Sequence, residues 1–162
     1  MYVPPCYAGF KEYLAEKGFT VYPYEFDCFG AKHPFVDIAG RMGSFYWAFE
    51  YKSETDSISR GVEQVRSYSD WFDYVVLVSE RVLNHAKSDL FWQLKGSGAG
   101  VWNFFPESAK CVEQLNPQLQ RPNRGNRRVV SSRFRALTHK RRKWTRAIRH
   151  LDLGQADLRN FV

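Results

Sequence analysis

The sequence predicts an α/β fold in which helices flank a mixed sheet, and three observations lead to this prediction. Residues 7–17 and 57–71 carry apolar side chains at helical spacing, whereas residues 35–41, 45–53 and 74–79 have the length and composition of strands. Apolar residues make up 44 % of the chain and aromatic residues 17 %, which is typical of a folded protein. A length of 162 residues is enough for one domain with a proper core and a small appendage.

The first elements follow from local signals. Residues 7–17 are predicted to form a helix that ends at Gly18, because glycine is the favoured residue just after a helix. Residues 19–26 alternate well enough to predict a strand, with Pro23 indicating an edge position or a bulge. Residues 27–34 are predicted to form a turn region.

Two charged strands follow and carry the chemistry of the chain. Residues 35–41 and 45–53 are predicted to form a hairpin, with Asp37 on the first strand and Glu50 and Lys52 on the second. Strand residues alternate between faces, so Glu50 and Lys52 share one face. The hairpin then allows Asp37 to lie beside Glu50. This predicts two carboxylates and an ammonium together at one end of otherwise apolar strands.

The remaining elements complete the α/β order. In the helix 57–71, capped by Asp56 or Ser57, Gln64 and Tyr68 lie one turn apart and both can face the charged strands, although core packing is an alternative role for Tyr68. The apolar run 74–79 follows that helix and is predicted to pair in parallel through a crossover. The later segments are predicted to be a helix at 84–95, a strand at 101–105 and its hairpin partner at 110–115.

The predicted cluster has a specific chemistry. Two hard oxygen ligands close together suit Mg²⁺ or Mn²⁺, which keep several waters and accept phosphate oxygens as further ligands. A lysine beside them can orient or deprotonate a water, or stabilise charge on a phosphate. Each of these charged residues alone would be interpreted as an ordinary strand-edge residue. Their combination on two strands before an amphipathic helix is much rarer by chance.

This arrangement resembles a known family. Asp37 followed by Glu50-Tyr51-Lys52, and then by Gln64 and Tyr68 four residues apart, resembles the PD-(D/E)xK nuclease superfamily with the Gln-x-x-x-Tyr motif of its RecB-like branches. The resemblance spans roughly residues 7–105. It departs from the family pattern at Val36, which stands where the family name places proline.

The resemblance implies a restriction-endonuclease-like fold and a metal-dependent nuclease. Asp37 and Glu50 would then ligate Mg²⁺ or Mn²⁺, with the backbone carbonyl of Tyr51 as a possible third ligand. Lys52 would position the attacking water, Gln64 would hold substrate or Lys52, and Tyr68 would support the wall of the site. In some branches a glutamate on the first helix joins the metal site. Glu12 is the candidate here, and a solvated helix face is the alternative.

The last third of the chain differs in charge. Residues 1–105 hold 10 Lys and Arg against 13 Asp and Glu, whereas residues 106–162 hold 14 against 4. We expect three parts: a nuclease-like domain at 1–115, a linker at 116–128 and a basic helical extension at 129–162. The candidate nucleic-acid-binding residues are Arg127, Arg128, Arg133, Arg135, Lys140, Arg142, Lys143 and Arg146. A docked solubilising helix, a calmodulin-binding helix and a membrane-surface helix are alternatives.

The sequence therefore predicts a metal-dependent nuclease that acts on nucleic acid, on DNA more than on RNA, in repair, recombination or defence. A non-catalytic nucleic-acid-binding module of the same fold and an RNA-directed nuclease are the alternatives. No apolar run is long enough for a membrane span, and the N-terminus lacks the pattern of a signal peptide. Three scattered cysteines fit free thiols in a reducing compartment. We therefore expect a cytoplasmic protein without a membrane partner, and a homodimer is possible.

Overall fold

The computed structural model describes residues 5–28, 35–83 and 89–158, and divides the chain into two compact units, Met1–Val130 and Ser131–Val162. The helices of the described residues are α1 (Pro5–Glu16), α2 (Ile58–Tyr68), α3 (Asp89–Ser97) and α4 (Arg124–Leu158). The strands are β1 (Thr20–Val21), β2 (Phe26–Asp27), β3 (Phe35–Val36), β4 (Ile38–Met42), β5 (Phe45–Lys52), β6 (Tyr74–Ser79), β7 (Gly100–Phe105) and β8 (Lys110–Leu115).

The first unit is built on a six-stranded mixed sheet with the order β1-β4-β5-β6-β7-β8. β4 pairs antiparallel with β5, β5–β6 and β6–β7 are parallel, and β7 pairs antiparallel with β8. The predicted α/β fold is confirmed, as are the crossover through α2 and the hairpin formed by β7 and β8. β2 and β3 form a separate two-stranded sheet.

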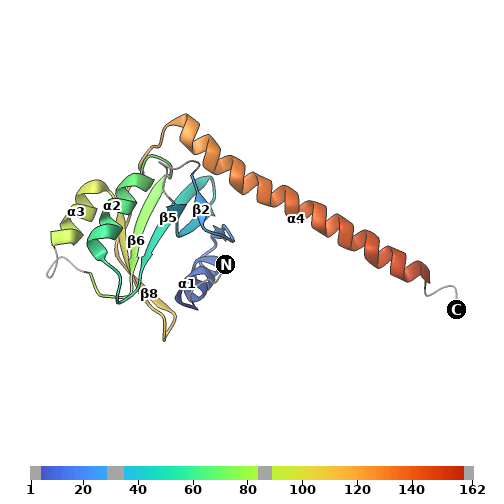
Figure 1. Cartoon of the computed structure of the whole chain (residues 1–162), viewed down its shortest axis with the longest axis horizontal. Helices are drawn as coiled ribbons and strands as arrows, with labels where there is room; N and C mark the ends of the chain where they lie inside the picture. Colours follow the sequence, from blue (N-terminus) through green and yellow to red (C-terminus); the bar gives the residue numbers. More distant parts are fainter. Residues whose placement is uncertain (1–4, 29–34, 84–88, 159–162) are drawn as a thin grey trace. The chain divides into compact units, whose positions relative to one another are not determined.

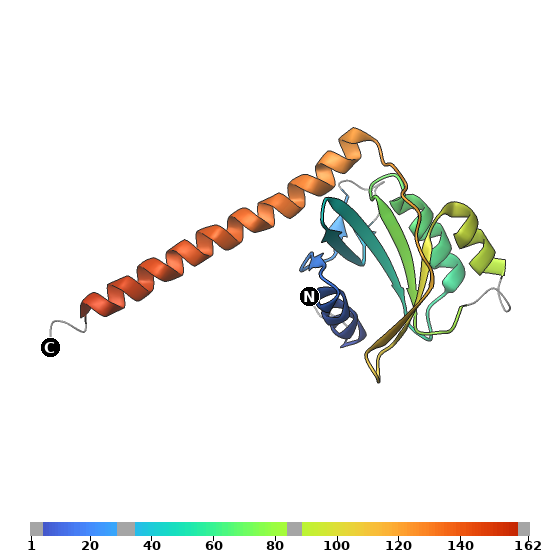
Figure 2. The same ribbon diagram turned by 180° about the vertical axis from the view of Figure 1, so that it is seen from behind.

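Helices cover both faces of this sheet: α1 lies against one face, and α2 and α3 lie against the other (Figures 1 and 2). The face under α1 carries an aromatic core, whose buried members are Phe10, Leu14, Phe19, Ile38, Phe49, Tyr51, Val76, Val78, Trp102 and Phe104. Within it, the Phe10 ring packs edge-to-face on Phe49 and Phe104, with centroids 5.6 and 5.3 Å apart. Because strand residues alternate, the neighbours of these core residues point toward α2.

The β4–β5 hairpin sets the register of the charged residues. Its turn is the pair Gly43–Ser44, and Gly43 has a φ of +60°, which glycine adopts without steric cost at the first position of a two-residue hairpin turn. Ile38 pairs with Phe49, so continuing this antiparallel register by one residue places Asp37 opposite Glu50. The two carboxylates therefore lie side by side, as expected, because the turn fixes the register of the hairpin.

Three elements differ from the sequence prediction. The strand predicted at 19–26 is wrong as one element: it is split into β1 and β2, which pair in different sheets on either side of Pro23, a residue that cannot donate to a ladder. α3 continues to Ser97, and the start of its predicted range, like much of the turn at 27–34, lies outside the described residues. α4 begins at Arg124 rather than near 129, because Asn123 caps it: its side-chain oxygen accepts the Asn126 N–H at 2.9 Å.

The start of α4 belongs to the first unit, and an ion pair holds it to the rest of that unit. The Arg127 Nε donates to the Asp73 carboxylate at 3.0 Å, and its Nη2 donates to the Ser44 carbonyl at 2.7 Å. Asp73 is buried and also accepts the Tyr46 N–H at 2.8 Å. We predicted Arg127 as a nucleic-acid-binding residue, but its guanidinium is used within the fold, where it also lies over the Tyr46 ring.

Asp73→Ala should lower the free energy of unfolding by about 3 kcal/mol, because it leaves the buried Tyr46 N–H without its acceptor and Arg127 without its counter-ion. Arg127→Ala should cost less, about 1 kcal/mol, since its guanidinium is partly solvated. Urea titrations measure both, with the exposed neighbour Arg128→Ala as the control expected to change little. If Arg127→Ala keeps full stability but weakens nucleic-acid binding, Arg127 is a phosphate contact and not an anchor.

Among the described residues, no helix combines the length and the apolar character needed to cross a membrane. The basic composition of α4 explains why its 35 residues do not qualify.

Candidate active site

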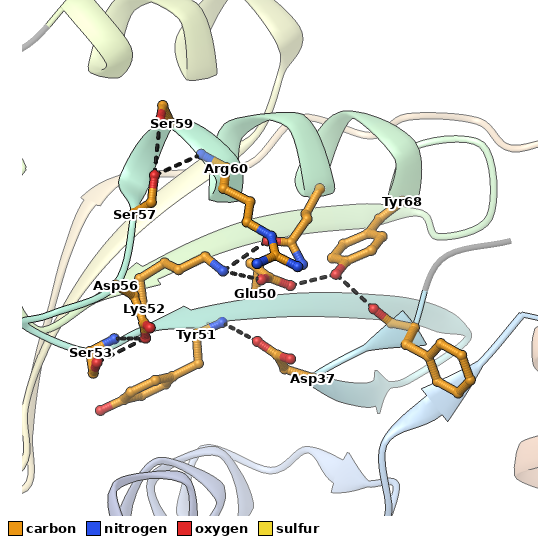
Figure 3. A network of polar contacts seen from close by, with 12 residues as sticks. Asp37, Glu50, Tyr51, Lys52, Ser53, Asp56, Ser57, Ser59, Arg60 and Tyr68 are labelled. Atoms are coloured by element: carbon orange, nitrogen blue, oxygen red, sulfur yellow. Dashed lines mark hydrogen bonds and ion pairs between the residues drawn. The ribbon is translucent and has the colours of Figure 1, made fainter. Parts of the chain in front are cut away.

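Glu50 and Lys52 lie at the end of β5, on the face that α2 covers, and α2 supplies two partners to them (Figure 3). The Lys52 Nζ donates to Glu50 Oε1 at 2.6 Å and to the Gln64 side-chain oxygen at 2.8 Å. The Tyr68 hydroxyl is hydrogen bonded to the other Glu50 oxygen, Oε2, and lies 2.9 Å from the Phe35 carbonyl oxygen. Strand and helix therefore hold four of the predicted site residues in one continuous network.

Asp37 is the fifth predicted member and lies at the bend between β3 and β4. Its Oδ2 accepts the Tyr51 backbone N–H at 2.9 Å, which fixes the carboxylate against β5. Its charge acts directly on Glu50, as the antiparallel register requires. The structure thus brings together Asp37, Glu50, Lys52, Gln64 and Tyr68. The role of the Tyr51 carbonyl as a third metal ligand stays a prediction.

Burial raises the pKa of both carboxyl groups, and the charge of Asp37 adds to the effect on Glu50. Glu50 is 1 % exposed, and desolvation together with the Asp37 charge raises its pKa to about 7, although Lys52 and Tyr68 act in the opposite direction. Burial also raises the pKa of Asp37, against the Tyr51 N–H and the Lys52 charge, which lower it. Acids with perturbed pKa values gathered in one place are typical of functional sites.

The pKa of Glu50 predicts how the stability of the metal-free protein depends on pH. An acid whose pKa is higher in the folded than in the unfolded chain contributes stability below its ordinary value of 4.5 and loses it as the pH rises through about 7. The loss should be about 3 kcal/mol, and Glu50→Gln should remove it. In EDTA, the melting temperature of Glu50→Gln should therefore rise relative to that of the wild type as the pH increases from 4.5 to 7. The exposed Glu63→Gln is the control, and parallel curves for Glu50→Gln and the wild type would contradict the assignment.

The donor set fits Mg²⁺ or Mn²⁺. Two carboxylates and one lysine leave the cluster one negative charge in excess when both acids are ionised, and each carboxylate keeps oxygen lone pairs beyond those used in hydrogen bonds. No group of three acidic, histidine or cysteine side chains with metal-binding geometry occurs in the described part of the chain. Two protein carboxylates with water and phosphate oxygens are nevertheless a usual set for Mg²⁺.

Two further residues of the site were not identified from the sequence. Tyr7 of α1 lies beside Asp37, and its half-buried phenol has a raised pKa, first through burial and then through the Asp37 charge. Gly61 of α2 is buried over Lys52, and a Cβ there would lie 2.9 Å from Lys52 Cε and 2.8 Å from Leu77 Cδ1. A glycine inside a helix lowers helix stability by about 1 kcal/mol relative to alanine. A glycine within the predicted helix was therefore the sequence signal that could have indicated close packing here.

The predicted metal ligand Glu12 is not part of this cluster. Glu12 is exposed and makes none of the cluster's hydrogen bonds among the described residues. It lies five residues after Tyr7, about 140° around α1, so it belongs to a different helix face. Arg133 is partly buried, and the side chain of Arg146 lies outside the described part of the structure. The basic residues that are exposed are Arg128, Arg135, Lys140, Arg142 and Lys143.

Comparisons with known proteins support the fold and do not indicate a function. A solved structure described as the SPO1766 protein of unknown function, from Silicibacter pomeroyi, is similar with a TM-score of 0.61 and 17 % identity, covering 90 % of this chain and 94 % of that one. No protein-family model matches this chain, and no curated protein does. The fold therefore occurs in a second protein, and the functional argument rests on the geometry of the site.

Proposed function

We propose that this protein is a metal-dependent nuclease of the restriction-endonuclease-like fold that hydrolyses phosphodiester bonds, most readily those of DNA. One observation carries the proposal: Glu50, almost fully buried, is held between Lys52 and Tyr68 with a second carboxylate, Asp37, beside it. Burying an acid is costly, and acids with raised pKa values cluster at functional sites.

The order of elements supports the same proposal. A helix precedes an antiparallel pair that carries the acids, and a helix then crosses over to a parallel strand. The resemblance to the PD-(D/E)xK superfamily implies this order. Gln64 and Tyr68, the residues of the Gln-x-x-x-Tyr pattern, each contact a residue of the Glu-x-Lys pattern.

Asp37 and Glu50 would hold Mg²⁺ or Mn²⁺ in this site. Bound there, the cation would polarise a phosphoryl oxygen and lower the pKa of a coordinated water. Lys52 has three N–H donors, of which Glu50 and Gln64 accept two, and the third is available to orient the attacking water. Gln64 fixes the direction of the lysine, and Tyr68 fixes that of Glu50. The attacking water would lose a proton to solvent and bond through its oxygen to phosphorus, while the bond to the leaving oxygen breaks in line with it and that oxygen takes a proton from a second water.

The charge distribution supports nucleic acid as the substrate. The first unit holds 15 basic and 15 acidic residues, so the excess of +7 belongs to residues 131–162, with nine Lys and Arg against two Asp. Such a basic helix supplies the sequence-independent attraction to phosphates that nucleic-acid-binding proteins use. A non-catalytic nucleic-acid-binding module is the alternative, and the complete set of Asp37, Glu50 and Lys52 favours catalysis over it.

Incubation of the purified protein with end-labelled single-stranded DNA, duplex DNA and RNA tests the proposal. Each substrate is incubated with Mg²⁺, Mn²⁺ or EDTA. Cleavage that needs the metal and is faster on DNA is the expected result. Binding of all three without cleavage in either metal would establish the non-catalytic module, and faster cleavage of RNA would identify an RNA-directed nuclease.

A further inference from the structure

Arg60 lies on the same edge of α2 as the two helix residues of the site. Positions 60, 64 and 68 are successive i, i+4 neighbours, and each step advances only about 40° around an α-helix. Gln64 contacts Lys52 and Tyr68 contacts Glu50. A side chain one turn before Gln64 therefore lies at the border of the same cluster.

The Arg60 guanidinium is not used by the fold. Its backbone N–H is bonded to the capping Ser57 hydroxyl at 3.4 Å, but its side chain is exposed and has no hydrogen-bond or ion-pair partner in the described residues. Figure 3 shows this side chain extending from α2 toward Glu50 and Lys52. In contrast, the Arg81 guanidinium donates to the Asp56 backbone carbonyl, and that of Arg127 donates to the Asp73 carboxylate. The Arg60 guanidinium thus has no partner among the described residues and is directed toward the candidate active site.

The proposed reaction needs a cation at this place. A phosphodiester carries one negative charge, and attack by an activated water places a second on its non-bridging oxygens. Lys52 already donates to two protein acceptors, so it has one donor left. A guanidinium has five N–H groups in a planar fork that matches two phosphate oxygens.

We propose that Arg60 binds the non-bridging oxygens of the reacting phosphate, as the phosphate clamp of the candidate active site. This inference rests on the proposed nuclease function and adds a substrate-binding residue to it. The contact is with the sugar-phosphate backbone and carries no base specificity.

Kinetics of Arg60→Ala and Arg60→Lys test the clamp, with Arg66→Ala as the matched control. Arg66 is also exposed on α2 but lies about 240° further around the helix. Arg60→Ala should lower kcat by about 100-fold, as loss of one transition-state donor does, whereas Arg66→Ala should stay within about twofold of the wild type. Arg60→Lys should recover only part of the rate, because a point charge does not replace a bidentate fork.

Chemical rescue separates a clamp from a general charge effect. Guanidinium chloride at low millimolar concentration should raise the rate of Arg60→Ala several-fold, and the same concentration of sodium chloride should not. Because Arg60 is exposed, circular dichroism of the variants should match that of the wild type. A wild-type rate for Arg60→Ala, or a loss that guanidinium and sodium ions restore equally, would overturn the inference.

A binding measurement decides the point even without turnover. With Ca²⁺ in place of Mg²⁺, fluorescence anisotropy compares a short DNA oligonucleotide with its uncharged methylphosphonate analogue. Arg60→Ala should weaken binding of the phosphate form about tenfold and leave that of the analogue unchanged, and equal losses on both would exclude a phosphate contact. If the wild type cleaves none of the substrates, only the nuclease proposal fails, because the comparison of phosphate and methylphosphonate binding still tests the phosphate contact of Arg60.

Discussion

Substitution of Glu50 by Gln, Asp37 by Asn or Lys52 by Ala is expected to abolish metal-dependent cleavage, each with a loss on the order of 1,000-fold or more. When residues act as one catalytic unit, replacing any one of them removes nearly the whole rate enhancement. The physical reason is their connection: Glu50 accepts a hydrogen bond from Lys52 at 2.6 Å and experiences the Asp37 charge. Initial rates with Mg²⁺ or Mn²⁺ on labelled DNA measure the loss.

Glu63→Gln provides a matched control for this first experiment. It removes a carboxylate from the exposed side of α2 and should leave the rate unchanged. DNA binding in EDTA should also be largely retained in all the variants, because the basic residues of α4 remain. Cleavage at the wild-type rate by Lys52→Ala would show that the role assigned to this lysine is wrong.

Neutralising four exposed basic residues of α4 is expected to weaken DNA binding strongly without stopping the chemistry. The variant replaces Arg135, Lys140, Arg142 and Lys143 by glutamine. Each phosphate contact contributes about −0.9 to the slope of log K against log salt, so loss of four contacts makes the slope shallower by about 3.6. Anisotropy titrations between 50 and 200 mM salt, roughly the range in which such contacts dominate, measure it. Cleavage at low salt and saturating DNA should persist.

The control for this second experiment removes the same formal charge from the first unit. Arg66, Lys95, Lys110 and Arg121, all exposed, are replaced by glutamine and should change the slope little. Equal slopes for the α4 variant and the wild type would exclude α4 as a phosphate-binding element. A truncated protein provides a second test, and the chain should be cut after Val130, where the first compact unit ends. Truncation near 116 would delete Arg127 and Gln120, which are bonded to Asp73.

Local sequence patterns predicted most of the arrangement of the candidate site, because that arrangement depends on short-range geometry. Alternation along β5 places Glu50 and Lys52 on one face, and helical spacing places Gln64 and Tyr68 on one edge of α2. The hairpin register then follows from the turn, and it puts Asp37 opposite Glu50. None of these relations spans more than one turn or one hairpin, so the residue types and their spacing were sufficient.

Contacts between distant segments could not be predicted in this way. Tyr7 reaches Asp37 only because α1 packs across the sheet, and Arg127 is bound by Asp73, 54 positions earlier in the chain. Pro23 was interpreted as an edge or a bulge, whereas two different pairing partners divide that segment into separate sheets. In each case the partner is selected by packing over a long loop of chain, and no local pattern encodes it.

The sequence by itself determined which groups form the candidate site, and the tertiary structure decided their electrostatic state. The spacing of Asp37, Glu50 and Lys52 alone predicted that these three charged groups lie together, as they do in the structure. That Glu50 has its pKa raised to about 7 follows only from its burial beneath α2 beside a second acid. That Arg127 is bound by an acid, while the Arg60 guanidinium has no partner among the described residues, follows only from which groups lie within reach. Charge and spacing are properties of the chain, whereas desolvation and pairing arise only when distant segments pack together.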